Sequence, residues 1–129
     1  MLADDIATKI QEESLGTVGT DIYIGELPFD VNDSVAVVYS PSPQPNQALH
    51  YYAQVVDIRG RFGKYEEGYQ KMQDIMDVFH RTQNYEMGDY YVYISFANSM
   101  IQDNDRDIER RHLLQLTLTF IYRLVEEGS

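Results

Sequence analysis

The side chains best suited to chemistry lie in one acidic segment near the C-terminal end of the chain. It reads DNDRDIERRHLL, with Asp103, Asp105 and Asp107 at alternate positions. Calcium loops of the EF-hand class begin with this spacing of carboxylates. That class also needs a glycine at its sixth position and a bidentate glutamate at its twelfth, and this sequence has Ile108 and Leu114 there. We therefore predict a solvated acidic loop that holds no functional metal.

The other reactive side chains do not combine into a catalytic motif. His50, His80 and His112 lack the spacing of metal ligands, and the chain has no cysteine. There is no G-x-S-x-G motif and no P-loop. Adjacent carboxylates such as Glu66 and Glu67 point apart on a helix and so cannot act as a pair. We expect no enzyme activity and no cofactor.

Charge narrows the choice of partners. The 129 residues carry a formal net charge of −11, with 10 basic and 21 acidic side chains. Affinity for nucleic acid depends mainly on lysines and arginines that neutralise phosphates, so this balance argues against a general nucleic-acid binder. A small basic patch at Arg106, Arg110 and Arg111 remains open. The acidic start, MLADDIATKI, does not read as a signal peptide, and no apolar run would span a bilayer, so we expect a protein made in a cytoplasm without a membrane partner.

The hydrophobic pattern indicates which elements position these side chains. An apolar stripe at Leu2, Ile6 and Ile10 predicts a short helix. A longer helix is predicted from Lys64 onward, because large apolar residues recur there every three or four positions. Alternating or β-branched runs predict five strands, which read DIYIGELP, SVAVVYSP, YYAQVVDIRGR, DYYVYISFA and LLQLTLTFIYR.

The order of helix, three strands, helix and two strands predicts an α+β fold. We expect one domain, residues 1–129, with a mixed, largely antiparallel five-stranded sheet and both helices packed on one face. The segment PSPQPNQ, with Pro41, Pro43 and Pro45, and the segment NSMIQDNDRDIERRH are interpreted as loops. The predicted core consists of Ile6, Ile10, Val56, Ile58, Tyr69, Met72, Met76, Phe79, Val92, Ile94, Leu116 and Leu118.

Two helices cover one face of such a sheet and leave the other to solvent or to a partner. The alternation assigns to that other face a semi-apolar set rich in tyrosine: Tyr51, Val55, Tyr91, Tyr93, Thr117, Thr119 and Ile121. Surfaces of this composition are enriched at protein interfaces. We therefore predict a subunit or partner contact there. The alternative is that the N-terminal segment or long loops cover this face.

The stretch VVYSPSPQPNQALHYYAQVVDIRGRFGKYEEGYQKMQDIMDVFH resembles the centre of the tail terminator family of long-tailed bacteriophages, also known as minor capsid or tail completion proteins. Members have a strand, a proline-containing loop, a strand ending near V-x-R-x-R and a helix with spaced apolar positions. Those positions are filled here by Val56, Ile58, Arg59, Arg61, Tyr69, Met76 and Phe79. The end of the chain resembles the closing hairpin of the family. Alanines common in the family's second helix are replaced by Glu67 and Gly68.

The resemblance implies a structural protein of the virion, assembled in the host cytoplasm and located at the junction of tail and neck. Six copies would form a ring on the tail tube protein, stop tube growth and present a surface to the head-completion proteins of the neck. DNA would pass through the lumen without specific binding. By resemblance and exposure, the predicted contacts are the tyrosine-bearing face, the proline loop, and the acidic loop with Asp103, Asp105, Asp107, Arg110 and Arg111, which is also the predicted lumen lining.

Two other classes of function stay open. A soluble acidic adaptor would work as a monomer or dimer, and its mass in solution would reveal it. A metal-assisted enzyme would use the acidic loop, and titration with calcium or magnesium would reveal that.

Overall fold

The computed structural model describes residues 2–39, 51–106 and 110–125, and of residue 105 the backbone alone. The chain runs as follows: α1 (Leu2–Glu12), β1 (Ile22–Ile24), β2 (Ser34–Tyr39), β3 (Tyr52–Phe62), α2 (Tyr65–Phe79), β4 (Thr82–Met87), β5 (Tyr90–Ala97), β6 (Gln102–Arg106) and β7 (His112–Leu124). The α+β class is confirmed. In the described residues neither helix is long and apolar enough to cross a membrane.

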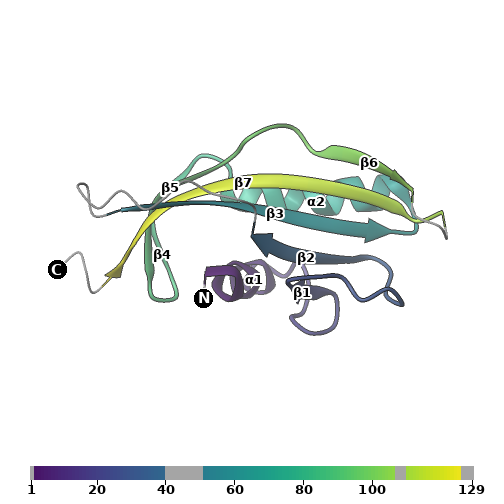
Figure 1. Ribbon diagram of the computed structural model, residues 1–129, viewed down its shortest axis with the longest axis horizontal. Coiled ribbons are helices and arrows are strands. Elements are labelled where there is room, and N and C mark those ends of the chain that lie inside the picture. The colour runs from purple at the N-terminus through teal and green to yellow at the C-terminus, as the bar shows by residue number, and fades with distance from the viewer. Residues whose placement is uncertain (1, 40–50, 107–109, 126–129) are drawn as a thin grey trace.

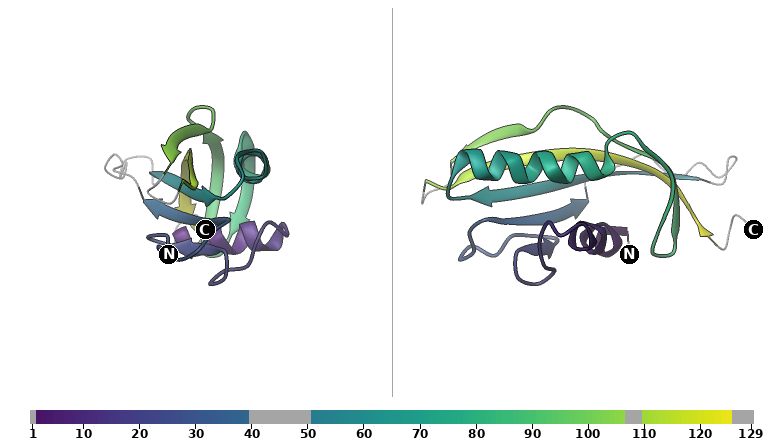
Figure 2. Two further views of the ribbon diagram at one scale, coloured as in Figure 1. Left: turned by 90° about the vertical axis from the view of Figure 1, so that its right-hand side faces the viewer. Right: turned by 180° about the vertical axis from the view of Figure 1, so that it is seen from behind.

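The strands form one open sheet in the order β1-β2-β3-β7-β5-β4. β6 also pairs with the first residues of β7, whereas β5 pairs with the later ones. Only the β1–β2 pair is parallel among these pairings, so the sheet is mixed and largely antiparallel, as predicted. The two longest strands, β3 and β7, pair antiparallel and form its curved spine (Figure 1). Figure 2 shows that α1 and α2 lie apart from each other against the twisted sheet. Both helices contribute to the same core, on one face of the sheet.

The prediction of five strands is wrong, because the sheet has seven. The two missed strands are β4, which reads TQNYEM, and β6, which reads QDNDR. Both are polar and lack the alternation by which a half-buried strand is recognised. The β4–β5 hairpin closes through the two residues Gly88 and Asp89, with Gly88 at a φ of 62° that favours glycine. The acidic segment that we interpreted as a loop is therefore partly a strand of the β6–β7 hairpin.

A β-bulge in β5 moves residues that alternation alone had assigned to the other face. Val92 lies opposite Tyr122, but Ile94 lies opposite Ile121, so Tyr93 is an extra residue in the ladder. Beyond the bulge, Ser95 points into the core and is fully buried, whereas Ile94 is only half-buried. The predicted place of Ile94 in the core is therefore wrong. The buried Ser95 hydroxyl donates to the Phe79 carbonyl at 2.7 Å and lies 2.7 Å from the Tyr85 hydroxyl.

The remaining core residues are where the periodicity predicts them. Of the predicted set, Ile6, Ile10, Val56, Ile58, Met72, Phe79, Val92, Leu116 and Leu118 are buried, and Tyr69 and Met76 pack against them half-buried. Leu2 is buried with the other residues of the apolar stripe of α1, and Ala3 and Ala7 beside it are buried as well. Ile75 adds to the buried residues of α2. Phe79 and Phe120 meet edge to face with ring centroids 5.5 Å apart.

One aromatic ring fixes how α2 approaches the sheet. Phe62, the last residue of β3, is 3% exposed and lies between Gly60 and Gly68. A methyl group on Gly68 would come within 2.5 Å of Phe62 Cδ2, and one on Gly60 within 2.8 Å of its Cζ. The two glycines therefore make room for the ring, although Gly68 weakens the helix that contains it.

Candidate functional site

The face of the sheet opposite the helices brings together most of the predicted interface residues. The ladder places Val55 opposite Thr119 and Tyr91 opposite Arg123 on this side. The bulge adds Ile94 and Phe96 to it. We call this surface the open face, and it comprises Val55, Arg59, Tyr91, Tyr93, Ile94, Phe96, Thr117, Thr119, Ile121 and Arg123. Tyr51 is half-buried and directly precedes β3.

One end of the open face carries an ordered aromatic and cationic cluster. The Arg123 guanidinium lies 4.6 Å from the ring centroid of Tyr91 and 6.0 Å from that of Tyr93. The two tyrosine rings are 5.3 Å apart, and Tyr93 is 38% exposed. The carbonyl oxygens of Leu124 and Val125 accept hydrogen bonds from Arg123 Nη1. Tyrosine and arginine held in this way lose little freedom on binding, which is a property of interface hot spots.

The middle of the open face is polar but internally bonded. Asp57 is 6% exposed, accepts a hydrogen bond from Thr117 Oγ1 at 2.8 Å and lies 3.7 Å from Arg59 Nη2. Thr119 Oγ1 donates to Asn98 Oδ1 at 2.6 Å. The carboxylate of Asp57 is therefore shielded, and the exposed charge here is the Arg59 side chain, which is 56% accessible.

The other end of this sheet face is partly covered by residues 25–33, which connect β1 and β2. Arg61 donates to the Pro28 carbonyl at 2.6 Å, and Arg111 donates to the Phe29 carbonyl at 2.8 Å. The Arg111 guanidinium also lies 5.0 Å from the ring of Phe29. Arg111 is only 6% exposed, so its charge anchors the chain's own connecting segment.

A groove remains between this connection and the open face. Its volume is about 330 Å³, and its lining includes Leu27, Ala36, Val38, Arg59, Leu113 and Gln115. The lining combines apolar side chains with polar and charged ones, which include Glu26 and Arg59. A groove of this kind can receive side chains from another protein surface.

A second group of tyrosines lies on the helical side of the sheet. The ring centroids of Tyr52 and Tyr122 are 5.6 Å apart, and those of Tyr90 and Tyr122 are 5.2 Å apart. The Tyr39 hydroxyl accepts a hydrogen bond from the backbone of Ala3 at 2.9 Å. Burial, together with the neighbouring tyrosines, raises the pKa of Tyr122 to about 12. These rings close the core beside α1 and so contribute to the fold.

The acidic segment is spread over the β6–β7 hairpin. Asp103 lies in β6 opposite Leu114, and it lines a hollow at the start of α2 together with Tyr65, Arg106 and His112. Arg110 is exposed, with a φ of 64°. Asp107, Pro41, Pro43, Pro45 and the side chain of Asp105 lie outside the described residues. Within the described part of the chain, no three histidines or carboxylates gather to hold a metal. The lumen role of this segment stays a prediction.

The predicted interface residues did not include four members of the open face, namely Arg59, Ile94, Phe96 and Arg123. The extra residue that brings Ile94 and Phe96 to this side leaves no mark in the alternating pattern. A sequence signal for the Arg123 contact did exist, since Arg123 continues the alternation of Thr117, Thr119 and Ile121 along β7.

Comparison with known proteins identifies the family. The model of the bacteriophage tail terminator protein family matches residues 9–124. The match runs from the second half of α1 to the end of β7 and includes every residue of the open face. A search of curated proteins finds no match. This chain belongs to the bacteriophage tail terminator family and is a structural protein of the phage tail.

Proposed function

We propose that six copies of this protein form a ring that caps the tail tube, stops its growth and joins the tail to the head-completion proteins of the neck. The number six, the tube and the neck come from the resemblance described above. The observation that carries the proposal is the open face. Its side chains are ordered by the chain's own bonds and leave aromatic and cationic groups accessible.

A ring needs a contact that repeats from copy to copy. A head-to-tail contact closes into a ring when its rotation permits. A stable contact buries about 800 Å² on each partner, and tyrosines supply such area while their hydroxyls keep polar partners. The negative net charge suits passage of DNA through the lumen, because phosphates would slide past without specific binding.

Analytical ultracentrifugation of the protein with and without purified tail tubes tests the ring. We expect a hexamer on or released from tubes, and shorter tubes when the protein is present during tube polymerisation. The double substitution Tyr91→Ser and Tyr93→Ser should abolish ring formation with the fold retained. Tyr23→Ser, which changes a tyrosine of β1, is the matched control and should assemble normally.

A strict monomer under every condition, tubes included, would contradict the proposal and favour the adaptor function. Labelled antibody should bind intact virions at the junction of tail and neck. Labelling elsewhere on the particle would place the protein in another part of the tail.

A further inference from the structure

We propose that the outer surface of α2 in one copy binds the open face around Arg59 in the next copy. This inference rests on the ring of the proposed function and specifies which two surfaces make its repeating contact. We call the first surface the α2 stripe, and it comprises Glu66, Gln70, Gln73, Asp74 and Asp77.

The α2 stripe is acidic, and the strands of the open face carry arginines. Within their bounds, α1 and α2 contain seven carboxylates and two lysines. The strands β3 and β7 present the guanidinium groups of Arg59 and Arg123 on the open face, where Asp57 is 6% exposed and bonded to Thr117. The exposed carboxylates on this side are Glu26, which lines the groove, and Glu86, which lies opposite Tyr91. A protein with a net charge of −11 that nevertheless presents arginines on one face has a surface complementary to its own helices.

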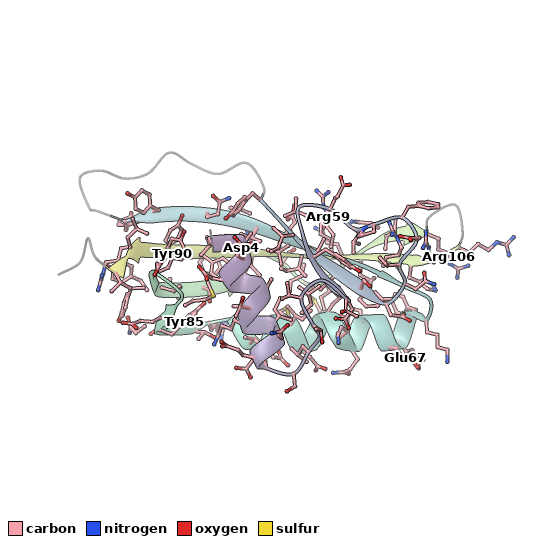
Figure 3. The ribbon with its side chains drawn as sticks, turned by 90° about the horizontal axis from the view of Figure 1, so that it is seen from below. Asp4, Arg59, Glu67, Tyr85, Tyr90 and Arg106 are labelled. Atoms are coloured by element: carbon pink, nitrogen blue, oxygen red, sulfur yellow. The ribbon has the colours of Figure 1, made fainter. Side chains whose placement is uncertain are left out.

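The two surfaces also lie where a ring needs them. α2 packs on the side of the sheet opposite the open face, since its buried residues belong to the core on the helical side. Figure 3 shows Arg59 of β3 and Glu67 of α2, which precedes the stripe residue Gln70 by one turn, at opposite sides of the molecule. A head-to-tail ring requires two different, complementary surfaces on each copy. An isologous contact would bring the α2 stripe against itself and place like charges together, which is unfavourable.

The α2 stripe is ordered and is not needed for the core. Gln70 donates to Asp74 at 2.8 Å, and Gln73 donates to Asp77 at 3.1 Å, so two carboxylates are held in place. The core of α2 is formed by other residues, which include Met72, Ile75 and Phe79. The stripe therefore presents ordered carboxylates at the surface, and they can be changed without disturbing the core.

The contact has an apolar component as well. The groove of about 330 Å³ beside Arg59 has Ala36, Val38 and Leu113 in its lining. Two contacts of about 800 Å² per copy would use roughly a fifth of the 7415 Å² accessible surface.

Charge reversal on each surface tests the proposal. The first variant carries Glu66→Lys and Asp77→Lys, and the second carries Arg59→Glu and Arg123→Glu. A control variant carries Glu12→Lys and Glu13→Lys, which change the net charge as much as the first variant does but lie at the end of α1. Circular dichroism and thermal unfolding establish that each variant is folded. Ring formation is measured by sedimentation with purified tail tubes.

We expect wild type and control to form rings, and each reversed variant alone to lose them because like charges then face each other. A one-to-one mixture of the two reversed variants should form rings again. When the two variants alternate around the ring, the lysines on α2 of the first variant face the glutamates on the open face of the second. The native α2 stripe of the second variant then faces the native arginines of the first.

Reversed variants that assemble alone, or a mixture that stays dissociated while wild type assembles, would overturn this inference and leave the ring intact. Failure of wild type itself to assemble would overturn the proposed function and the inference with it.

Discussion

Replacing Gly68 by alanine should destabilise the protein, although alanine is the better helix former. In an exposed helix the change stabilises by about 1 kcal/mol. Here the new methyl group would lie 2.5 Å from Phe62 Cδ2 and 2.7 Å from its Cβ. Both distances are far below van der Waals contact, and the ring is held against Gly60 on its other side, so it cannot shift without cost.

The magnitude follows from these opposing effects. Overpacking a core typically costs about 1–3 kcal/mol, and partial exposure of a buried phenylalanine adds a share of the 3–5 kcal/mol that its loss would cost. After subtracting the gain in helix propensity, we expect Gly68→Ala to lower the free energy of unfolding by about 1–3 kcal/mol. Urea unfolding followed by circular dichroism measures this.

A double-mutant cycle isolates the cause. In a Phe62→Ala background Cγ and Cδ2 are absent and only Cβ remains beside Gly68, so Gly68→Ala should cost less there, with a coupling energy of about 1–3 kcal/mol. Gly63→Ala is the control, because a methyl group there meets no atom within 4 Å. Stabilisation by Gly68→Ala in the wild-type background, or equal effects in both backgrounds, would refute the packing argument.

Three further predictions concern the core. Ser95→Ala should cost about 1–3 kcal/mol, because it leaves the Tyr85 hydroxyl and a helix carbonyl without their buried partner; a change below about 0.5 kcal/mol in urea unfolding would contradict this. Met72→Ala should cost about 2–5 kcal/mol and Met76→Ala clearly less, since Met72 is fully buried and Met76 half-buried; the reverse order of unfolding midpoints would contradict the packing. The raised pKa of Tyr122 favours its neutral form in the folded state, so this contribution to stability is complete below pH 10 and is lost as the pH rises from about 10 to about 12. Tyr122→Phe should reduce that alkaline decline in the free energy of unfolding, and an unchanged pH profile would show that Tyr122 has no part in it.

The elements with strong periodicity could be predicted from the sequence. The apolar periodicity of α2 and the alternation of β7 both indicate the correct buried face, because each is long enough to repeat its pattern several times. The α+β class follows from their order. The polar edge strand β4 could not be identified by hydrophobic alternation, although the Gly88 turn is a signal of a hairpin.

The misassigned face of Ile94 has a different origin. Periodicity assumes an uninterrupted ladder, and a single extra residue at Tyr93 exchanges the two faces for the rest of β5. The alternation before and after the bulge looks the same in the sequence. The burial of a serine in place of an isoleucine is therefore decided by pairing with β7, which is a long-range property.

The site was predictable to the extent that it depends on β7 and β3. Val55, Thr117, Thr119 and Ile121 share a face because strand alternation requires it. The anchoring role of Arg111 was not predictable, because its hydrogen bonds reach carbonyl oxygens about 80 positions away in the sequence. Charge composition alone gave no indication that Arg59 and Arg123 lie on the open face and the acidic α2 stripe on the other side of the sheet.

That separation bears on when a ring would form. Each copy added to a ring brings a net charge of −11, so copies repel one another at long range even if their contact surfaces attract. Repulsion between distant exposed charges is screened beyond about 8 Å at physiological ionic strength, whereas close pairs at a buried contact are screened much less. We therefore expect free protein to assemble more readily at physiological salt than at low salt. Contacts with the tube end would add the remaining stabilisation, so that rings form mainly where a tube has to be terminated.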